Sequence, residues 1–197
     1  MRLLVATTNP HKVREIRSLL GDAPVELIAL SDLRPVPEPE ETGETFQQNA
    51  ALKARHYAAE HGITTVADDS GLIIDALDGQ PGVRSARYVR PDATYPERFA
   101  EIFGRLAARP DAPRTARFVC AVAVVRDRDV LFETTGTVEG EISDRPRGSG
   151  GFGYDPIFYY PPYGCTFGEV DEATKLAVAH RGHAFRKLAD WLRLASL

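Results

Sequence analysis

The segment at residues 115–126 is the feature that most constrains the fold of this 197-residue chain. Apolar residues alternate along it, and in its second half the intervening residues are apolar too. A strand with two apolar faces is typical of the centre of a sheet that is covered on both sides. Residues 127–129 predict a turn into an antiparallel partner strand at residues 130–138. We therefore expect one α/β domain, residues 1–197, with an elongated mixed β-sheet flanked by helices.

The start of the chain predicts a strand, a turn and a helix. Residues 2–6 have the pattern of a buried strand, Asn9 is a favoured N-cap, and Pro10 is favoured at the first helical position. This arrangement groups Thr7, Asn9 and Lys12 around a helix N-terminus, where free N–H groups and the helix dipole favour an anion. An ordinary cap with a solvated lysine is the alternative, and by itself the more common one.

Two adjacent carboxylates, Asp68 and Asp69, follow a short β-branched run and are predicted to lie in a loop at the end of a strand. Neighbouring carboxylates repel each other, so they need a cation or a shared proton. Mg²⁺ usually reaches proteins through one or two carboxylates plus substrate phosphates. Glu41 lies just ahead of a helix predicted by the capping box of Thr45 and Gln48, where it is free to reach a metal. The alternative is a solvated acidic turn.

The glycine-rich segment at residues 147–158 carries two aromatic residues, Phe152 and Tyr154. An aromatic ring on a loop of this kind is suited to stacking on a flat base. A tight turn held by a buried ring is an equal alternative. Further along, His180 and Arg181 precede the last predicted helix, where they suit the edge of a base or a phosphate. Such a histidine is more often a cap or a surface residue.

The bulk properties exclude several classes of partner. The net charge of −4 argues against duplex nucleic acid and anionic membranes. The two cysteines, Cys120 and Cys165, give neither a metal-binding spacing nor a disulfide framework. We find no signal segment and no apolar run of membrane-spanning length, so we expect a cytoplasmic location.

Taken in order, these stretches resemble the inosine triphosphate pyrophosphatase family, the Ham1-type non-canonical purine nucleoside triphosphatases. The resemblance covers nearly the whole chain. It rests on residues 7–12, 41–54, 67–72, 81–88, 150–156 and 180–182. Each stretch is a weak signal by itself, but their order and joint presence are specific.

The resemblance implies Mg²⁺-dependent hydrolysis of deaminated purine nucleoside triphosphates (ITP, dITP, XTP) to the monophosphate and pyrophosphate, which cleans the nucleotide pool. It also implies two lobes with a nucleotide-binding groove between them, and a homodimer. Asp69 would be the general base and a metal ligand, assisted by Asp68, and Glu41 would be the second metal ligand.

The same resemblance implies a set of substrate contacts. Phosphates would be held by Thr7, Asn9, Lys12 and Lys175, with Ser70 beside them. Phe152 would stack on the base, and Asp155, His180 and Arg181 would read its edge. The other implied binding positions in these motifs are Thr8, Pro10, His11, Gly153 and Tyr154.

Selectivity is expected to depend on hydrogen-bond donors aimed at the 6-oxo group, because a 6-amino group would leave those donors unpaired. Two positions depart from the family pattern: Thr8 replaces the usual Gly or Ser, and Ala179 replaces the usual Ser. The rival interpretations are a pyrophosphatase of different base specificity and a nucleotide-binding protein without catalysis.

Overall fold

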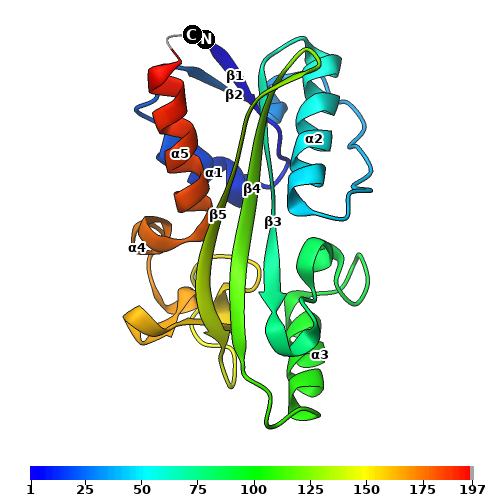
Figure 1. Cartoon of the computed structure of the whole chain (residues 1–197), viewed down its shortest axis with the longest axis vertical. Helices are drawn as coiled ribbons and strands as arrows, with labels where there is room; N and C mark the ends of the chain where they lie inside the picture. The colour runs from blue at the N-terminus through cyan, green and yellow to red at the C-terminus, as the bar shows by residue number, and fades with distance from the viewer. Residues whose placement is uncertain (196–197) are drawn as a thin grey trace. The chain divides into compact units, whose positions relative to one another are not determined.

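The computed structural model describes residues 1–195 and contains a seven-stranded sheet in the order β2-β1-β3-β4-β5-β6-β7 (Figure 1). β1 pairs in parallel with β2 and β3, whereas β6 pairs in antiparallel with β5 and β7. The prediction of a mixed sheet flanked by helices is therefore confirmed. The strands are β1 (Arg2–Val5), β2 (Glu26–Ala29), β3 (Thr65–Ile74), β4 (Thr115–Arg126), β5 (Asp129–Ile142), β6 (Phe158–Tyr160) and β7 (Cys165–Thr166).

The helices begin where local capping signals stand in the sequence. The Asn9 side chain accepts hydrogen bonds from the main-chain N–H groups of His11 and Lys12, and Thr45 forms the expected capping box with Gln48. Gly62 ends its helix in the left-handed region, at φ 63°. The helices are α1 (Pro10–Leu20), α2 (Phe46–His61), α3 (Tyr95–Ala107), α4 (Glu172–Val178) and α5 (His180–Leu194). Within residues 1–195 no helix is both long and apolar enough to span a membrane.

The described chain divides into two compact units. The first contains residues 1–69, 120–136 and 180–195, and the second contains residues 70–119 and 137–179. β3, β4 and β5 contribute residues to both units. The single domain over residues 1–197 and the groove between two lobes stay predictions.

The first unit has helices on both faces of its part of the sheet. On one face, α1 and α5 pack against β1, β3 and β4 around Val5, Val66 and Val122. The alternate strand residues, such as Ala67 and Ala121, are buried on the face that α2 covers (Figure 1). This two-sided burial confirms the prediction that residues 115–126 form a covered central strand.

The second unit is built around aromatic side chains. The rings of Phe118, Phe158 and Phe167 pack on one another, with centroids 4.5 and 5.1 Å apart for the pairs that include Phe158. Buried residues of α3 join the same core, among them Phe99 and Ile102. This core supports the glycine-rich loop and α4.

Asp68 and Asp69 lie inside β3, which runs without interruption from Thr65 to Ile74. The predicted loop at this point is therefore wrong. Asp and Ser favour turns because their side chains bond the local main chain, but the carboxylates here bond basic side chains of other elements. These tertiary contacts override the local preference. As a consequence, the two carboxylates point to opposite faces of the sheet.

Candidate active site

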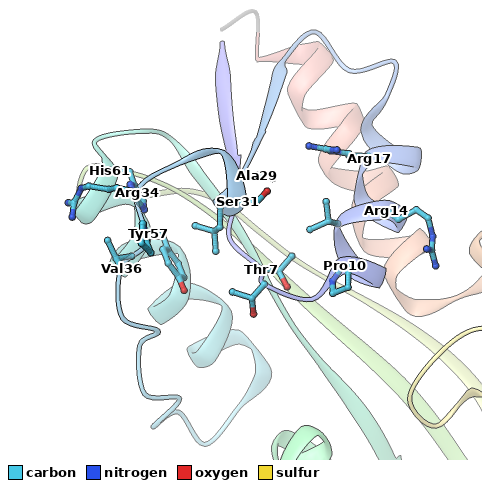
Figure 2. A pocket seen from close by; sticks show the side chains of 14 residues that line it. Thr7, Pro10, Arg14, Arg17, Ala29, Ser31, Arg34, Val36, Tyr57 and His61 are labelled. Atoms are coloured by element: carbon cyan, nitrogen blue, oxygen red, sulfur yellow. The ribbon is translucent and has the colours of Figure 1, made fainter.

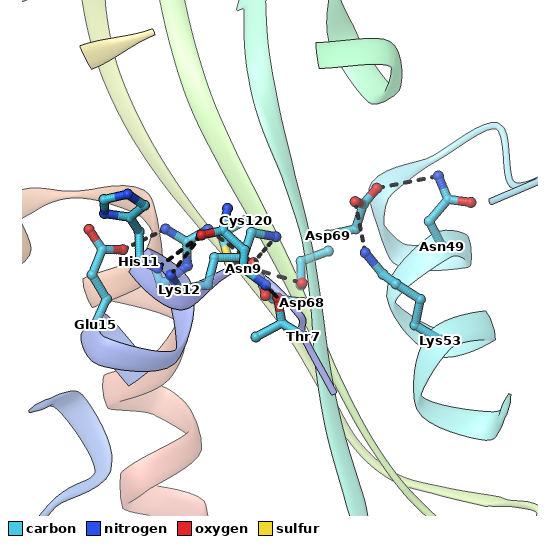
Figure 3. A network of polar contacts seen from close by, with 12 residues as sticks. Thr7, Asn9, His11, Lys12, Glu15, Asn49, Lys53, Asp68, Asp69 and Cys120 are labelled. Atoms are coloured by element: carbon cyan, nitrogen blue, oxygen red, sulfur yellow. Dashed lines mark hydrogen bonds and ion pairs between the residues drawn. The ribbon is translucent and has the colours of Figure 1, made fainter. Parts of the chain in front are cut away.

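Asp68 occupies the face of β3 that α1 and α5 cover (Figure 3). Its Oδ2 lies 3.0 Å from the ammonium of Lys12 and 3.0 Å from the guanidinium of Arg181. Arg181 also pairs with the buried Glu15, at 2.6 Å. Burial by itself would raise the pKa of Asp68, but Lys12 and Arg181 hold that pKa well below its usual range. The lowered pKa favours the charged form of Asp68, and its ion pair with Lys12 fixes the position of that ammonium.

Asp69 occupies the opposite face and contacts two residues of α2 (Figure 3). The Lys53 ammonium lies 3.1 Å from Oδ1 of Asp69 and 2.9 Å from Oε1 of Glu41. The side-chain amide of Asn49 donates to Oδ2 of Asp69 at 3.3 Å. Glu41 and Asp69, which lie far apart in the sequence, therefore contact the same ammonium, and their role as metal ligands stays a prediction.

The charges in this cluster perturb one another. Burial raises the pKa of Asp69 above its usual value, and Glu41 adds to the rise although Lys53 opposes it. Burial disfavours the charged form of Lys53, but Asp69, Asp68 and Glu41 together raise its pKa. A buried carboxylate with a raised pKa is suited to accept a proton from a bound water.

Lys53 and Asn49 belong to the candidate site through their contacts with Asp69, although the sequence pattern assigned them no role. Lys53 is nevertheless a charged residue on the helix face that also carries Ala50 and Tyr57, and it lies one turn after Asn49. Two polar residues four positions apart on an otherwise apolar helix face are the sequence pattern that could have indicated these contacts.

The donor set at Glu41 and Asp69 fits Mg²⁺. In the part of the chain that the structure describes, no group of three or more His, Cys, Asp or Glu side chains is placed to hold a metal. The carboxylates of Glu41 and Asp69, both bonded to the Lys53 ammonium, are hard oxygen donors of the kind that could hold Mg²⁺ together with phosphate and water oxygens.

The segment at residues 7–12 forms the turn into α1. The Thr7 hydroxyl accepts from the N–H of Asn9 at 3.2 Å, and the Thr8 hydroxyl donates to Glu38 at 2.8 Å. The His11 ring lies 3.1 Å from the guanidinium of Arg14. A cavity of about 600 Å³ adjoins this turn, and none of its 14 lining residues is acidic (Figure 2). Its basic lining residues are Arg14, Arg17, Arg34 and His61.

The second unit holds a separate cluster on the glycine-rich loop. Oδ2 of Asp155 accepts from the N–H of Phe152 at 2.8 Å and from the ammonium of Lys175 at 2.6 Å. The same ammonium lies 4.6 Å from the centre of the Phe152 ring, which is a cation–π contact. Gly151 has φ 67°, and a Cβ there would stand 2.1 Å from Asp155. The loop therefore needs glycine at this position to seat the carboxylate.

Several predicted residues have surroundings other than those expected. Lys175, expected among phosphate contacts, belongs to the Phe152 and Asp155 cluster. The Tyr154 ring is buried against Tyr95, and its hydroxyl donates to the carbonyl of Ser85. Any substrate contact of Tyr154 would have to come from its main chain.

The remaining residues that were predicted to contact substrate are near neighbours, along the chain, of residues in these clusters. His180 is the first residue of α5 and is buried, and Arg181 is 1% exposed with two of its nitrogens committed to carboxylates. Ser70 follows Asp69 in β3, Pro10 begins α1, and Gly153 lies against Tyr95. The substrate roles of these residues stay predictions.

Comparison with known proteins identifies the family. The model of the Ham1 family matches residues 3–191. The chain belongs to the Ham1 family. This Ham1 protein is 44% identical to the dITP/XTP pyrophosphatase of Geobacter sulfurreducens over 191 residues, which is 97% of this chain and 96% of the relative. It is also 44% identical to the protein of the same name from Shigella flexneri, over 98% of both chains.

A solved structure supports the same assignment. The HAM1 protein from Coxiella burnetii matches this Ham1 protein with a TM-score of 0.91 and 41% sequence identity, covering 98% of both chains. The family resemblance inferred from the motifs is therefore confirmed.

Proposed function

We propose that this Ham1 protein is a Mg²⁺-dependent nucleoside triphosphate pyrophosphatase acting on non-canonical purine nucleotides such as dITP, ITP and XTP. The observation that carries the proposal is the buried Asp69 that Lys53 joins to Glu41. This cluster occurs in a chain 44% identical to proteins named dITP/XTP pyrophosphatase. The cellular role would be to remove these nucleotides from the cytoplasmic pool.

The proposed chemistry assigns roles to four charged residues. Asp69 takes a proton from a water molecule as the water oxygen forms a bond to the α-phosphorus. The phosphorus–oxygen bond between the α and β phosphates breaks, and pyrophosphate leaves with the bridging oxygen. Lys12 and Lys53 offset the negative charge that grows on the phosphates. Glu41 and Asp69 would hold Mg²⁺, which supplies further positive charge to the phosphate oxygens when bound.

Base binding is assigned to the cluster of the second unit. Lys175 covers one face of the Phe152 ring, and we propose that the base stacks on the aromatic surface of Phe152. Stacking alone does not distinguish purines, because every purine presents a π-face. Selection of a 6-oxo base requires a donor aimed at that oxygen, and we propose the Lys175 ammonium, 4.6 Å from the centre of the Phe152 ring, as a candidate donor.

Product analysis tests the proposal. The purified protein is incubated with inosine, xanthosine, guanosine and adenosine triphosphates, with and without Mg²⁺, and products are separated by anion exchange. We expect monophosphate and pyrophosphate from inosine and xanthosine triphosphates only when Mg²⁺ is present. Release of orthophosphate would contradict the proposed bond cleavage, and equal rates for all four would indicate a pyrophosphatase of other specificity.

The variant Asp69→Asn separates catalysis from folding. Asparagine keeps the shape of the side chain but cannot accept the proton, so we expect turnover to fall by at least about 100-fold. Thermal unfolding followed by circular dichroism checks that the variant is folded. Turnover at the parent rate would show that Asp69 is not the general base.

A further inference from the structure

Asn49 is a buried polar residue that connects the two predicted metal ligands. Its side chain is 0% exposed and lies in the first turn of α2. The amide oxygen accepts from the main-chain N–H of Gly43 at 2.8 Å, and the amide nitrogen donates to Oδ2 of Asp69 at 3.3 Å. One planar group thus bonds β3 at one end and the loop that carries Glu41 at the other.

The contact with the loop is sterically tight. A Cβ on Gly43 would lie 2.5 Å from the Asn49 amide oxygen and 2.8 Å from Cβ of Gln48. The main chain two residues after Glu41 therefore rests directly on α2. Because carboxamide geometry is fixed, the Asn49 side chain sets the distance between this main chain and the Asp69 carboxylate.

Lys53 makes a second link from the same helix, but of a different kind. It joins the Glu41 and Asp69 carboxylates themselves, so it competes for the oxygens that a cation would take. Asn49 instead bonds the main chain on the Glu41 side and only Oδ2 of Asp69. The two hydrogen bonds of Asn49 can therefore persist when a cation replaces Lys53 at the carboxylates of Glu41 and Asp69.

We propose that Asn49 is a positioning residue that holds the Glu41 loop and the Asp69 carboxylate at a fixed separation. The inference rests on the proposed function and extends it to a residue that neither binds substrate nor transfers a proton. Asparagine suits this role because it offers one acceptor and one donor at opposite ends. Aspartate could not donate to Asp69, and alanine would leave a buried N–H without this acceptor.

The first test is the variant Asn49→Ala, measured without nucleotide or Mg²⁺. Amide hydrogen exchange read by NMR reports directly on the Gly43 N–H. We expect its protection factor to fall by about tenfold or more, because the N–H loses its acceptor. The variant Gln47→Ala is the matched control, since Gln47 lies in the same helical turn, is exposed, and donates from its side chain to the hydroxyl of Thr135 at 3.3 Å. The control should leave Gly43 protection unchanged.

Steady-state kinetics with inosine triphosphate give the second readout. We expect Asn49→Ala to lower kcat by about 10- to 100-fold with a smaller change in KM, because the reacting groups lose their relative placement while the phosphate-binding lysines remain. The variant Gly43→Ala perturbs the same contact from the loop side and should lower kcat in the same way. It serves as the second variant if Asn49→Ala does not fold.

The outcomes distinguish this inference from the proposed function. An inactive parent protein would contradict the function. An active parent with parental kcat in both folded variants, or with unchanged Gly43 protection in Asn49→Ala, would overturn the positioning role of Asn49.

Discussion

Asp68 is a buried carboxylate whose charged form is stabilised by two cations. Its oxygen bonds Lys12 and Arg181, and Arg181 in turn bonds Glu15. Taking charges out of water is costly, so each member of such a group depends on the others. Arg181 thus holds two carboxylates of the first unit in place.

Replacing Arg181 should therefore affect stability strongly. The variant Arg181→Ala leaves Glu15 and Asp68 buried without their shared cation, and we expect the free energy of unfolding to fall by about 3–5 kcal/mol. Urea denaturation measures this change. The control Arg193→Ala removes an exposed pair with Asp190 on the same helix and should cost less than about 1 kcal/mol. Equal losses in the two variants would contradict the role of Arg181.

Phe152 offers a prediction about affinity. Removal of the ring in Phe152→Ala removes the stacking surface, so we expect KM for inosine and xanthosine triphosphates to rise by the same factor, about tenfold or more. Initial-rate kinetics with both nucleotides measure it. A loss confined to inosine triphosphate would instead make Phe152 a residue that discriminates between bases.

Two elements, β5 and α5, approach each other closely at Gly136. A Cβ at this position would lie 2.2 Å from the carbonyl oxygen of His180 and 2.5 Å from the N–H nitrogen of Ala184. Both are main-chain atoms and cannot rotate away. The variant Gly136→Ala should therefore lose about 1–3 kcal/mol of stability, measured by thermal unfolding.

The opposite result is expected for a helical glycine with free space. Gly104 lies in α3, and a Cβ there would meet nothing within 4 Å. The variant Gly104→Ala should stabilise the protein by about 0.5–1 kcal/mol, because alanine loses less conformational entropy on folding. The same thermal unfolding experiment thus distinguishes steric from entropic effects of glycine.

Helix ends were predictable from the sequence because capping is local: Asn9, Thr45 and Gly62 act on residues within one turn. The interruption of β3 was predicted wrongly, because the partners that stabilise its carboxylates are distant in the chain. Arg181 and Asp68 are 113 positions apart, and no local pattern reveals their contact. The sequence motifs indicated where the candidate site lies. The contacts that Asn49 and Lys53 make with Asp69 could be identified from the three-dimensional structure but not from the sequence.

At the scale of the whole molecule, the net charge does not reveal where individual cations are placed. The chain carries a net charge of −4, yet the first unit gathers Lys12, Lys53 and Arg181 around its acidic strand. A few placed cations can therefore bind a polyanion on a chain whose average charge would repel it. Net charge excludes broad classes of partner but does not exclude a small phosphorylated ligand.

The oligomeric state is a further prediction at this scale. The family resemblance implies a homodimer, and we propose this state for the protein. Light scattering coupled to size exclusion should give about twice the chain mass of 21.7 kDa. A mass of one chain over a wide concentration range would contradict the proposal.

The alternation of side chains along β3 has an evolutionary consequence. Asp68 and Asp69 occupy different faces because they are consecutive in one strand. Insertion or deletion of a single codon upstream within this strand would exchange the two environments, so that Asp69, the proposed proton acceptor, would face Arg181 and Asp68 would face Lys53. Selection should therefore preserve the length of this strand even where its apolar residues are free to vary.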